Sequence, residues 1–253
     1  MSLINKPASI KGALALCITL PCLSTPSQAA SILIEPVDVL PAELFGIRGT
    51  VASESDRRTD RDVKYDNIRA SQVGMGYGLG DGLEIGAYVG YDQNNFKKAP
   101  DQDGLEGVSV YGKMVMSPNF SIKAGLTTGG EHDLYPYPND GVDLFVDVPF
   151  QRMVRNGDKI YGEIGYTLKD QDHLATDNYF NFGLGYEHPL KQTLSVNLEL
   201  VGDEGPVTRN QLQLLLGLSS HPTSMLWISP YVSMGVYDAS PEYAVGAKVE
   251  WRF

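Results

Sequence analysis

The sequence predicts an all-β protein, a transmembrane antiparallel up-and-down β-barrel of about 12 strands. Three observations support this prediction. The last eleven residues alternate between apolar and polar side chains, similar alternating runs recur after residue 43, and the connections between the runs are short and long in turn. An even number of strands and this order of connections are typical of barrels in the bacterial outer membrane.

The C-terminal run, residues 243–253, sets the pattern, because successive side chains of a strand point to opposite faces. Its apolar face carries Tyr243, Val245, Ala247, Val249, Trp251 and Phe253, and its polar face includes Lys248, Glu250 and Arg252. The apolar face suits the core of a soluble sandwich or the lipid-facing side of a membrane barrel. An aromatic last residue is typical of the signal that barrel insertion machinery recognises, so Phe253 and Trp251 are the predicted assembly signal. The run should pair with the first strand, leaving no free edge.

Period-two runs separated by turn signals predict the remaining strands. The candidate strands are residues 44–54, 67–78, 83–94, 108–117, 120–129, 142–153, 160–168, 178–187, 194–201, 211–219, 225–237 and 243–253. Short connections are expected at 79–82, 118–119, 155–158, 188–191 and 220–224, and longer ones at 55–65, 97–104, 130–140, 170–177 and 202–208, with 238–241 a brief exception. This layout leaves both termini on the periplasmic side, in one domain spanning residues 44–253.

The N-terminus, residues 1–29, predicts a cleaved signal peptide and hence export to the outer membrane of a Gram-negative cell. Lys6 and Lys11 precede an apolar run that is shorter than the roughly 20 residues a membrane-spanning helix needs. A membrane anchor or a lipoprotein modified at Cys22 are the alternatives. Residues 30–43 follow as a periplasmic N-terminal segment or, alternatively, as a segment inside the pore, since Pro36 and Pro41 interrupt any long strand.

Composition excludes several classes of function. The only cysteines, Cys17 and Cys22, fall in the predicted signal peptide, so the mature chain is expected to have neither disulfides nor thiol chemistry. The formal charge of −11 becomes more negative by two when Lys6 and Lys11 are removed. Nucleic acid is therefore not an expected partner, because phosphate binding requires a basic surface. Outer-membrane lipid is the expected surrounding, and the soluble alternative is a secreted sandwich or lipocalin-like barrel.

If the apolar faces look toward lipid, a mixed polar set faces the lumen. The candidate lumen-lining residues are Glu84, Tyr88, Asp92, Tyr111, Lys113, Lys123, Asp143, Asp147, Glu163, Glu187, Glu199, Lys248, Glu250 and Arg252. These side chains would filter solutes in a narrow channel, or they would pair across strands and fill a small barrel. The excess of carboxylates predicts a mild preference for cations.

Catalysis and metal binding have little support in the sequence. The four histidines, His132, His173, His188 and His221, are all expected in loops or turns, and no pair of them has the spacing of metal ligands. A barrel lipid hydrolase would need a nucleophile held beside a base, and no such arrangement is visible. We therefore predict no enzyme activity, no cofactor and no metal.

Several segments together resemble a known family. They are residues 77–86 (YGLGDGLEIG), the 111–113 strand before Ser117-Pro-Asn, 183–187 (GLGYE), 198–202 (LELVG) and 245–253 (VGAKVEWRF). They are similar to the outer-membrane transporter family named for the meta-cleavage pathway of phenol degradation, over roughly residues 65–253. The resemblance implies a barrel that admits small organic compounds, with aromatic ones as a candidate class, and it implies no catalytic or binding motif. The chain is also similar to the 12-stranded oligosaccharide channels, but it lacks their arginine-rich lumen.

The sequence thus favours a transporter or porin-like barrel for passive passage of small organic solutes. The alternative is a closed barrel with a structural or surface-interaction role, and a barrel hydrolase is the third candidate. A lumen blocked by side chains or by residues 30–43 would favour the closed barrel.

Overall fold

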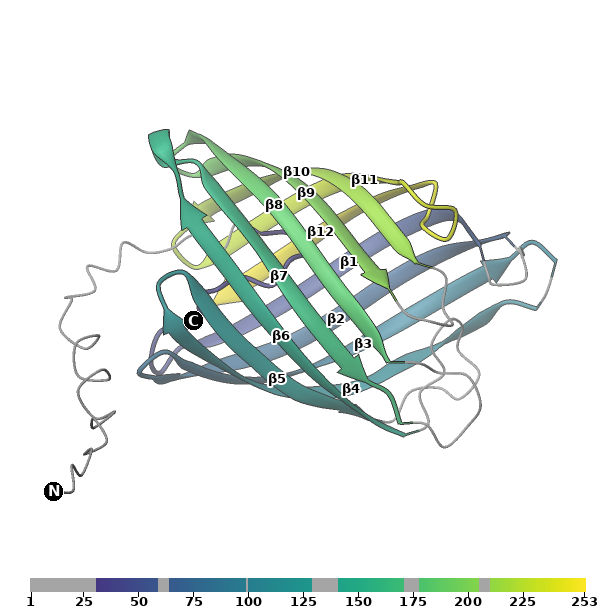
Figure 1. Ribbon diagram of the computed structural model, residues 1–253, viewed down its shortest axis with the longest axis horizontal. Coiled ribbons are helices and arrows are strands. Elements are labelled where there is room, and N and C mark those ends of the chain that lie inside the picture. The colour runs from purple at the N-terminus through teal and green to yellow at the C-terminus, as the bar shows by residue number, and fades with distance from the viewer. Residues whose placement is uncertain (1–30, 59–63, 99, 129–140, 171–177, 205–209) are drawn as a thin grey trace, which may run out of the picture.

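The computed structural model describes residues 31–58, 64–98, 100–128, 141–170, 178–204 and 210–253. Twelve antiparallel strands form one closed barrel, each bonded to its neighbours in the sequence (Figure 1). The strands are β1 (Phe45–Arg58), β2 (Lys64–Gly80), β3 (Leu83–Phe96), β4 (Gln102–Ser117), β5 (Phe120–Thr128), β6 (Val142–Met153), β7 (Lys159–Leu168), β8 (Tyr179–Lys191), β9 (Leu194–Glu204), β10 (Gln211–Thr223), β11 (Leu226–Gly235) and β12 (Tyr243–Arg252). The predicted all-β barrel is confirmed.

The barrel closes where its first and last strands meet. Strand β12 pairs with β1 from Gly46 opposite Arg252 to Ser55 opposite Tyr243, as the sequence predicts. At the end of this seam, Phe45 and Phe253 exchange both backbone hydrogen bonds, each 2.9 Å long. Because the ladder is continuous around the barrel, no strand edge is left unpaired.

The outer face of the barrel is apolar and the inner face is polar. Leu216, Val245 and Trp251 on the outside are 52%, 56% and 52% exposed, whereas Glu84, Glu199 and Glu250 on the inside are buried. This is the reverse of a soluble fold, whose exposed apolar patches are small. An outward apolar belt around a polar interior is the pattern of barrels in the outer membrane.

The strand boundaries differ from the prediction mainly at the two ends of the barrel. Strands β8 and β10 continue through His188 and His221 to Lys191 and Thr223, so these histidines lie in strands and not in turns. The cause is the tight register of the hairpins, in which Lys191 pairs with Leu194 and Thr223 with Leu226. At the opposite end, β1 and β4 include residues predicted as loop, because the ladder continues beyond the apolar belt, where alternation no longer marks it.

The predicted tight turn at 79–82 joins β2 and β3. Gly80, Asp81 and Gly82 all have positive φ, at 91°, 51° and 76°. Glycine adopts this conformation without steric cost, which explains its place on both sides of Asp81. The C-terminus lies at the same end of the barrel as these short turns (left in Figure 1).

The residues before β1 lie inside the barrel, so of the two alternatives, a periplasmic segment or a segment inside the pore, the structure has the second. We call residues 31–43 the lumen segment. Four of its apolar side chains, Ile32, Ile34, Val37 and Leu40, are at most 2% exposed, whereas Leu33 is 38% exposed. The predicted signal peptide, residues 1–29, and the predicted cleavage site before Ala30 lie outside the described residues. Among the residues described, no helix is both long and apolar enough to cross a bilayer.

Candidate functional site

Carboxylates of the barrel wall hold the lumen segment by its backbone. The two carboxylate oxygens of Glu199 accept hydrogen bonds from the backbone N–H groups of Ile32 and Leu33, at 2.6 and 2.9 Å. Glu163 accepts one from the N–H of Glu35 at 2.9 Å. Glu84 accepts one from the N–H of Leu40 at 2.7 Å.

These bonds meet a requirement of the backbone. A segment that runs through the lumen outside the strand ladder has amide groups that would otherwise be buried without partners. Hydrogen bonds to ionised carboxylates are roughly twice as strong as bonds between neutral groups. Glu84, Glu163 and Glu199 belong to β3, β7 and β9, so the lumen segment is bound to walls on different sides of the barrel.

A cluster of two lysines fixes the middle of the lumen segment. The Glu35 carboxylate accepts hydrogen bonds from Lys113 Nζ and Lys123 Nζ, both at 2.9 Å. Lys113 Nζ also donates to the carbonyl oxygens of Pro36 and Asp38, at 2.5 and 2.7 Å. The buried Lys113 ammonium thus has three acceptors, all in the lumen segment, and this matches its three donors.

A second ionic cluster lies beside the first on the inner wall. Arg48 Nη1 is 2.9 Å from Glu84 Oε1, and Arg48 Nε is 3.4 Å from Glu250 Oε2. The Tyr111 hydroxyl donates to Glu84 Oε1 at 2.7 Å. Glu250 in turn accepts from Arg252 Nε at 2.6 Å. These bonds join β12, β1, β3 and β4 along one side of the inner wall.

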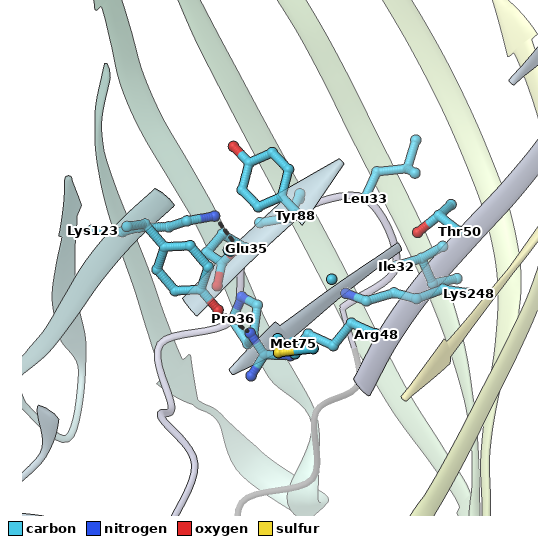
Figure 2. A pocket seen from close by; sticks show the side chains of 14 residues that line it. Ile32, Leu33, Glu35, Pro36, Arg48, Thr50, Met75, Tyr88, Lys123 and Lys248 are labelled. Atoms are coloured by element: carbon cyan, nitrogen blue, oxygen red, sulfur yellow. Dashed lines mark hydrogen bonds and ion pairs between the residues drawn. The ribbon is translucent and has the colours of Figure 1, made fainter. Parts of the chain in front are cut away.

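A cavity of about 280 Å³ remains between the lumen segment and the wall formed by β12 and by β1 to β5. Its lining includes Arg48, Tyr88, Lys123 and Lys248 from the wall and residues 32–36 from the segment (Figure 2). Both polar and apolar groups face this space. A small molecule can fit in this space.

All predicted lumen residues lie on the inner face, and they fall into two groups. The first group surrounds the lumen segment and cavity: Glu84, Tyr88, Tyr111, Lys113, Lys123, Glu163, Glu199, Lys248, Glu250 and Arg252. The second comprises Asp92, Asp143 and Glu187, together with Asp147, which is opposite Lys123 in the register of β5 and β6 and so lies next to the first group. Asp143 pairs with Lys169 at 2.5 Å and Glu187 with Lys159 at 2.9 Å.

Two residues at the centre of these contacts, Arg48 and Glu35, are missing from the predicted set. Arg48 lies between the outward residues Ile47 and Gly49, so the alternation of β1 would have placed it in the lumen. Glu35 precedes a proline in a segment without period-two alternation. Its role depends on contacts with β4 and β5, which no local pattern reveals.

Two of the four histidines, His188 and His221, belong to the described residues, and His188 lies beside an acidic residue. His188 Nδ1 is 2.8 Å from Asp158 Oδ1, at the end of the barrel that carries the short turns. The Tyr186 hydroxyl donates a hydrogen bond to the same carboxylate at 2.7 Å. The hydrogen bonds from Tyr186 and then His188 lower the pKa of Asp158. His132 and His173 lie outside the described residues. Within the described ranges, no cluster of His, Cys, Asp or Glu could hold a metal ion.

Comparison with known proteins identifies similar structures but no similar sequences. No family model and no curated protein matches the chain. An outer membrane channel from Pseudomonas putida F1 superposes with a TM-score of 0.61 at 9% identity, covering 87% of this chain and 100% of that one. The translocator domain of the autotransporter NalP from Neisseria meningitidis gives 0.57 at 11% identity, covering 86% and 90%. The CymD monoaromatic hydrocarbon channel gives 0.50 at 7% identity, covering 84% and 88%. At these identities the likeness shows a shared barrel fold.

Proposed function

We propose that this protein is an outer-membrane channel of the transporter or porin-like type, through which small organic solutes pass by diffusion. The observation that carries the proposal is the cavity inside a closed barrel with an apolar outer belt. A barrel that served only as a scaffold would need no space lined by polar and aromatic side chains. Proteins named as channels share the fold.

We further propose that this chain is related to the transporter family of the phenol meta-cleavage pathway. The proposal rests on the segments of the sequence that resemble that family. The tyrosines at the cavity, Tyr88 and Tyr111, support aromatic compounds as solutes, since aromatic rings pair favourably with one another. One protein with this fold is named a monoaromatic hydrocarbon channel.

A closed structural barrel is the second candidate, and the lumen segment is the observation that favours it. Residues 31–43 occupy much of the lumen and are tied to the wall by charged hydrogen bonds. Passage through the barrel then requires either a path beside the segment, through the cavity, or displacement of the segment.

Conductance of the refolded protein in planar bilayers, together with solute flux into liposomes, separates the two candidates. A channel gives ion current and flux of small neutral solutes from the wild-type protein. Because carboxylates outnumber cationic groups among the predicted lumen residues, we expect that current to show a mild preference for cations. Absence of both current and flux, in the wild type and in a variant with a weakened lumen segment, would favour the closed barrel.

A further inference from the structure

The charges around the cavity differ from those of the chain as a whole. Its lining includes three cations, Arg48, Lys123 and Lys248, and one carboxylate, Glu35. The carboxylates Glu84, Glu163 and Glu199 are engaged by backbone N–H groups of the lumen segment. An acidic protein therefore has a locally cationic space at the centre of its lumen.

Two of these cations form ion pairs with carboxylates. Arg48 lies 2.9 Å from Glu84 and 3.4 Å from Glu250. Lys123 lies 2.9 Å from Glu35. Neither of these cations lacks a counter-charge.

The third cation, Lys248, is different. Its Nζ donates to the carbonyl oxygen of Ser31 at 3.2 Å, and no carboxylate oxygen of the described residues lies within 4.0 Å of it. In Figure 2 the Lys248 ammonium points into the middle of the cavity, toward Arg48. An ammonium has three donors, so the bond to Ser31 leaves donors directed at the empty space.

Apart from Thr50, the remaining side chains that line the cavity are apolar or aromatic. They include Tyr88 and Tyr111 from the wall and Ile32 from the lumen segment (Figure 2), whereas Met75 contributes backbone and its side chain is 62% exposed on the outer face. The volume of about 280 Å³ is at the lower limit of known ligand pockets, roughly 300–1,000 Å³, so only a small molecule fits. The complementary ligand has one anionic group for Lys248 and a compact apolar or aromatic body.

We propose that this cavity is a binding site for small aromatic monocarboxylates, with Lys248 as the group that recognises the carboxylate. The inference rests on the proposed channel function in that it names the class of solute. A carboxylate would give the Lys248 ammonium the charge-assisted partner that it lacks, while Thr50 at the same wall offers a hydroxyl donor. Arg48 and Lys123 already have carboxylates of the protein beside them, so the cavity offers one ammonium without such a partner, which favours a single carboxylate on the ligand.

The test compares 4-fluorobenzoate with 4-fluorobenzamide, which has the same shape and no charge. Binding of each to the full-length mature protein in detergent is titrated by ¹⁹F NMR. We expect the carboxylate to bind about tenfold more tightly than the amide, the effect of one hydrogen bond to a charged group. Lys248→Gln should weaken carboxylate binding about tenfold without changing amide binding, and Lys248→Arg should retain most of it.

Lys191→Gln is the matched control, because it removes one positive charge at an exposed position on the short-turn end. It should leave both affinities unchanged. Heat-modifiable migration on gels verifies that each variant forms a barrel. Equal affinities of carboxylate and amide, or equal carboxylate affinities of the wild type and Lys248→Gln, would overturn the proposal.

Liposome flux of a neutral solute separates this inference from the proposed function. Flux without binding that depends on Lys248 refutes the monocarboxylate site and leaves the channel intact. Binding that depends on Lys248, without flux of any solute, supports the site and refutes passage.

Discussion

Replacing Glu35 by glutamine should release the lumen segment from the barrel wall. The Glu35 carboxylate is the shared acceptor of Lys113 and Lys123, both at 2.9 Å. Glutamine has nearly the same shape but no charge. The variant therefore removes the ion pairs while the packing of the neighbouring apolar side chains Ile34 and Val37 is kept.

The magnitude follows from the contacts. Removing one partner of a buried ion pair costs about 3–5 kcal/mol, and the Glu35 side chain is only 17% exposed, so solvent screening is small. Lys113 keeps the carbonyl oxygens of Pro36 and Asp38, and Lys123 stays 4.7 Å from the centre of the Tyr111 ring. We therefore take the lower value, about 3 kcal/mol, which corresponds to about a 100-fold increase in the population with the segment displaced.

Thiol labelling measures this population. Ile34, in the middle of the lumen segment, is 0% exposed. The natural cysteines lie at positions 17 and 22, so a protein refolded without residues 1–29 carries only an introduced one. In an Ile34→Cys background, the rate of maleimide labelling is proportional to the displaced fraction when reclosing is fast. We expect the rate to rise about 100-fold with Glu35→Gln.

Glu43→Gln is the matched control for this experiment. It makes the same chemical change in the same segment, at an exposed carboxylate near the start of β1. Its labelling rate should equal that of the parent protein. Rates within about twofold for Glu35→Gln and the parent would show that the two lysines do not hold the segment, which would refute the reasoning.

Three further predictions concern assembly, packing and pH. Phe253→Asp should lower the amount of barrel in the outer membrane more than it lowers flux per molecule, because the residue closes the seam with Phe45 and is the predicted assembly signal; normal levels on membrane blots would contradict this. With Ile34 intact, Gly183→Ala should increase maleimide labelling of Val37→Cys, a buried position of the lumen segment, since the new Cβ would lie 2.6 Å from Ile34 Cγ1; Gly112→Ala, whose Cβ meets nothing within 4 Å, should not. Asp158→Asn should reduce the loss of thermal stability in acid, followed by heat-modifiable migration across a pH series. The pKa of Asp158 is lower in the folded protein than its ordinary value. The stabilisation by the Asp158 carboxylate is therefore present above the ordinary carboxyl pKa and is lost as the pH falls through the lowered value. A pH profile of thermal stability that is the same in Asp158→Asn and in the wild type would contradict this prediction.

The faces of the barrel could be predicted from the sequence because a strand has a period of two. Glu84 on β3 and Lys248 on β12 are assigned to the lumen by their neighbours alone, without knowledge of any partner. The seam between β1 and β12 could also be predicted, since a barrel in lipid must close. These predictions depend on local alternation and on a general rule about backbone groups.

The lumen segment could not be placed in the same way. Ile32 and Ile34 are apolar in a periplasmic tail or in a pore, and Pro36 is compatible with both. The decisive contact, from the N–H of Ile32 to Glu199, joins residues separated by 167 positions. No pattern within either stretch of the sequence indicates a contact between two residues so far apart in the chain. The cavity and its excess of cationic side chains can therefore be recognised only in the three-dimensional structure.

The lumen segment is covalently continuous with β1, and this has a consequence for how the barrel opens. A tethered group competes for its own site at an effective concentration on the order of millimolar for a short flexible linker. A dilute solute would have to exceed that local concentration to replace the segment by mass action. In the proposed channel, solutes that are scarce in the surroundings would therefore use the space beside the segment, or wait for the spontaneous displacement of the segment, whose frequency we predict the Glu35 carboxylate to set.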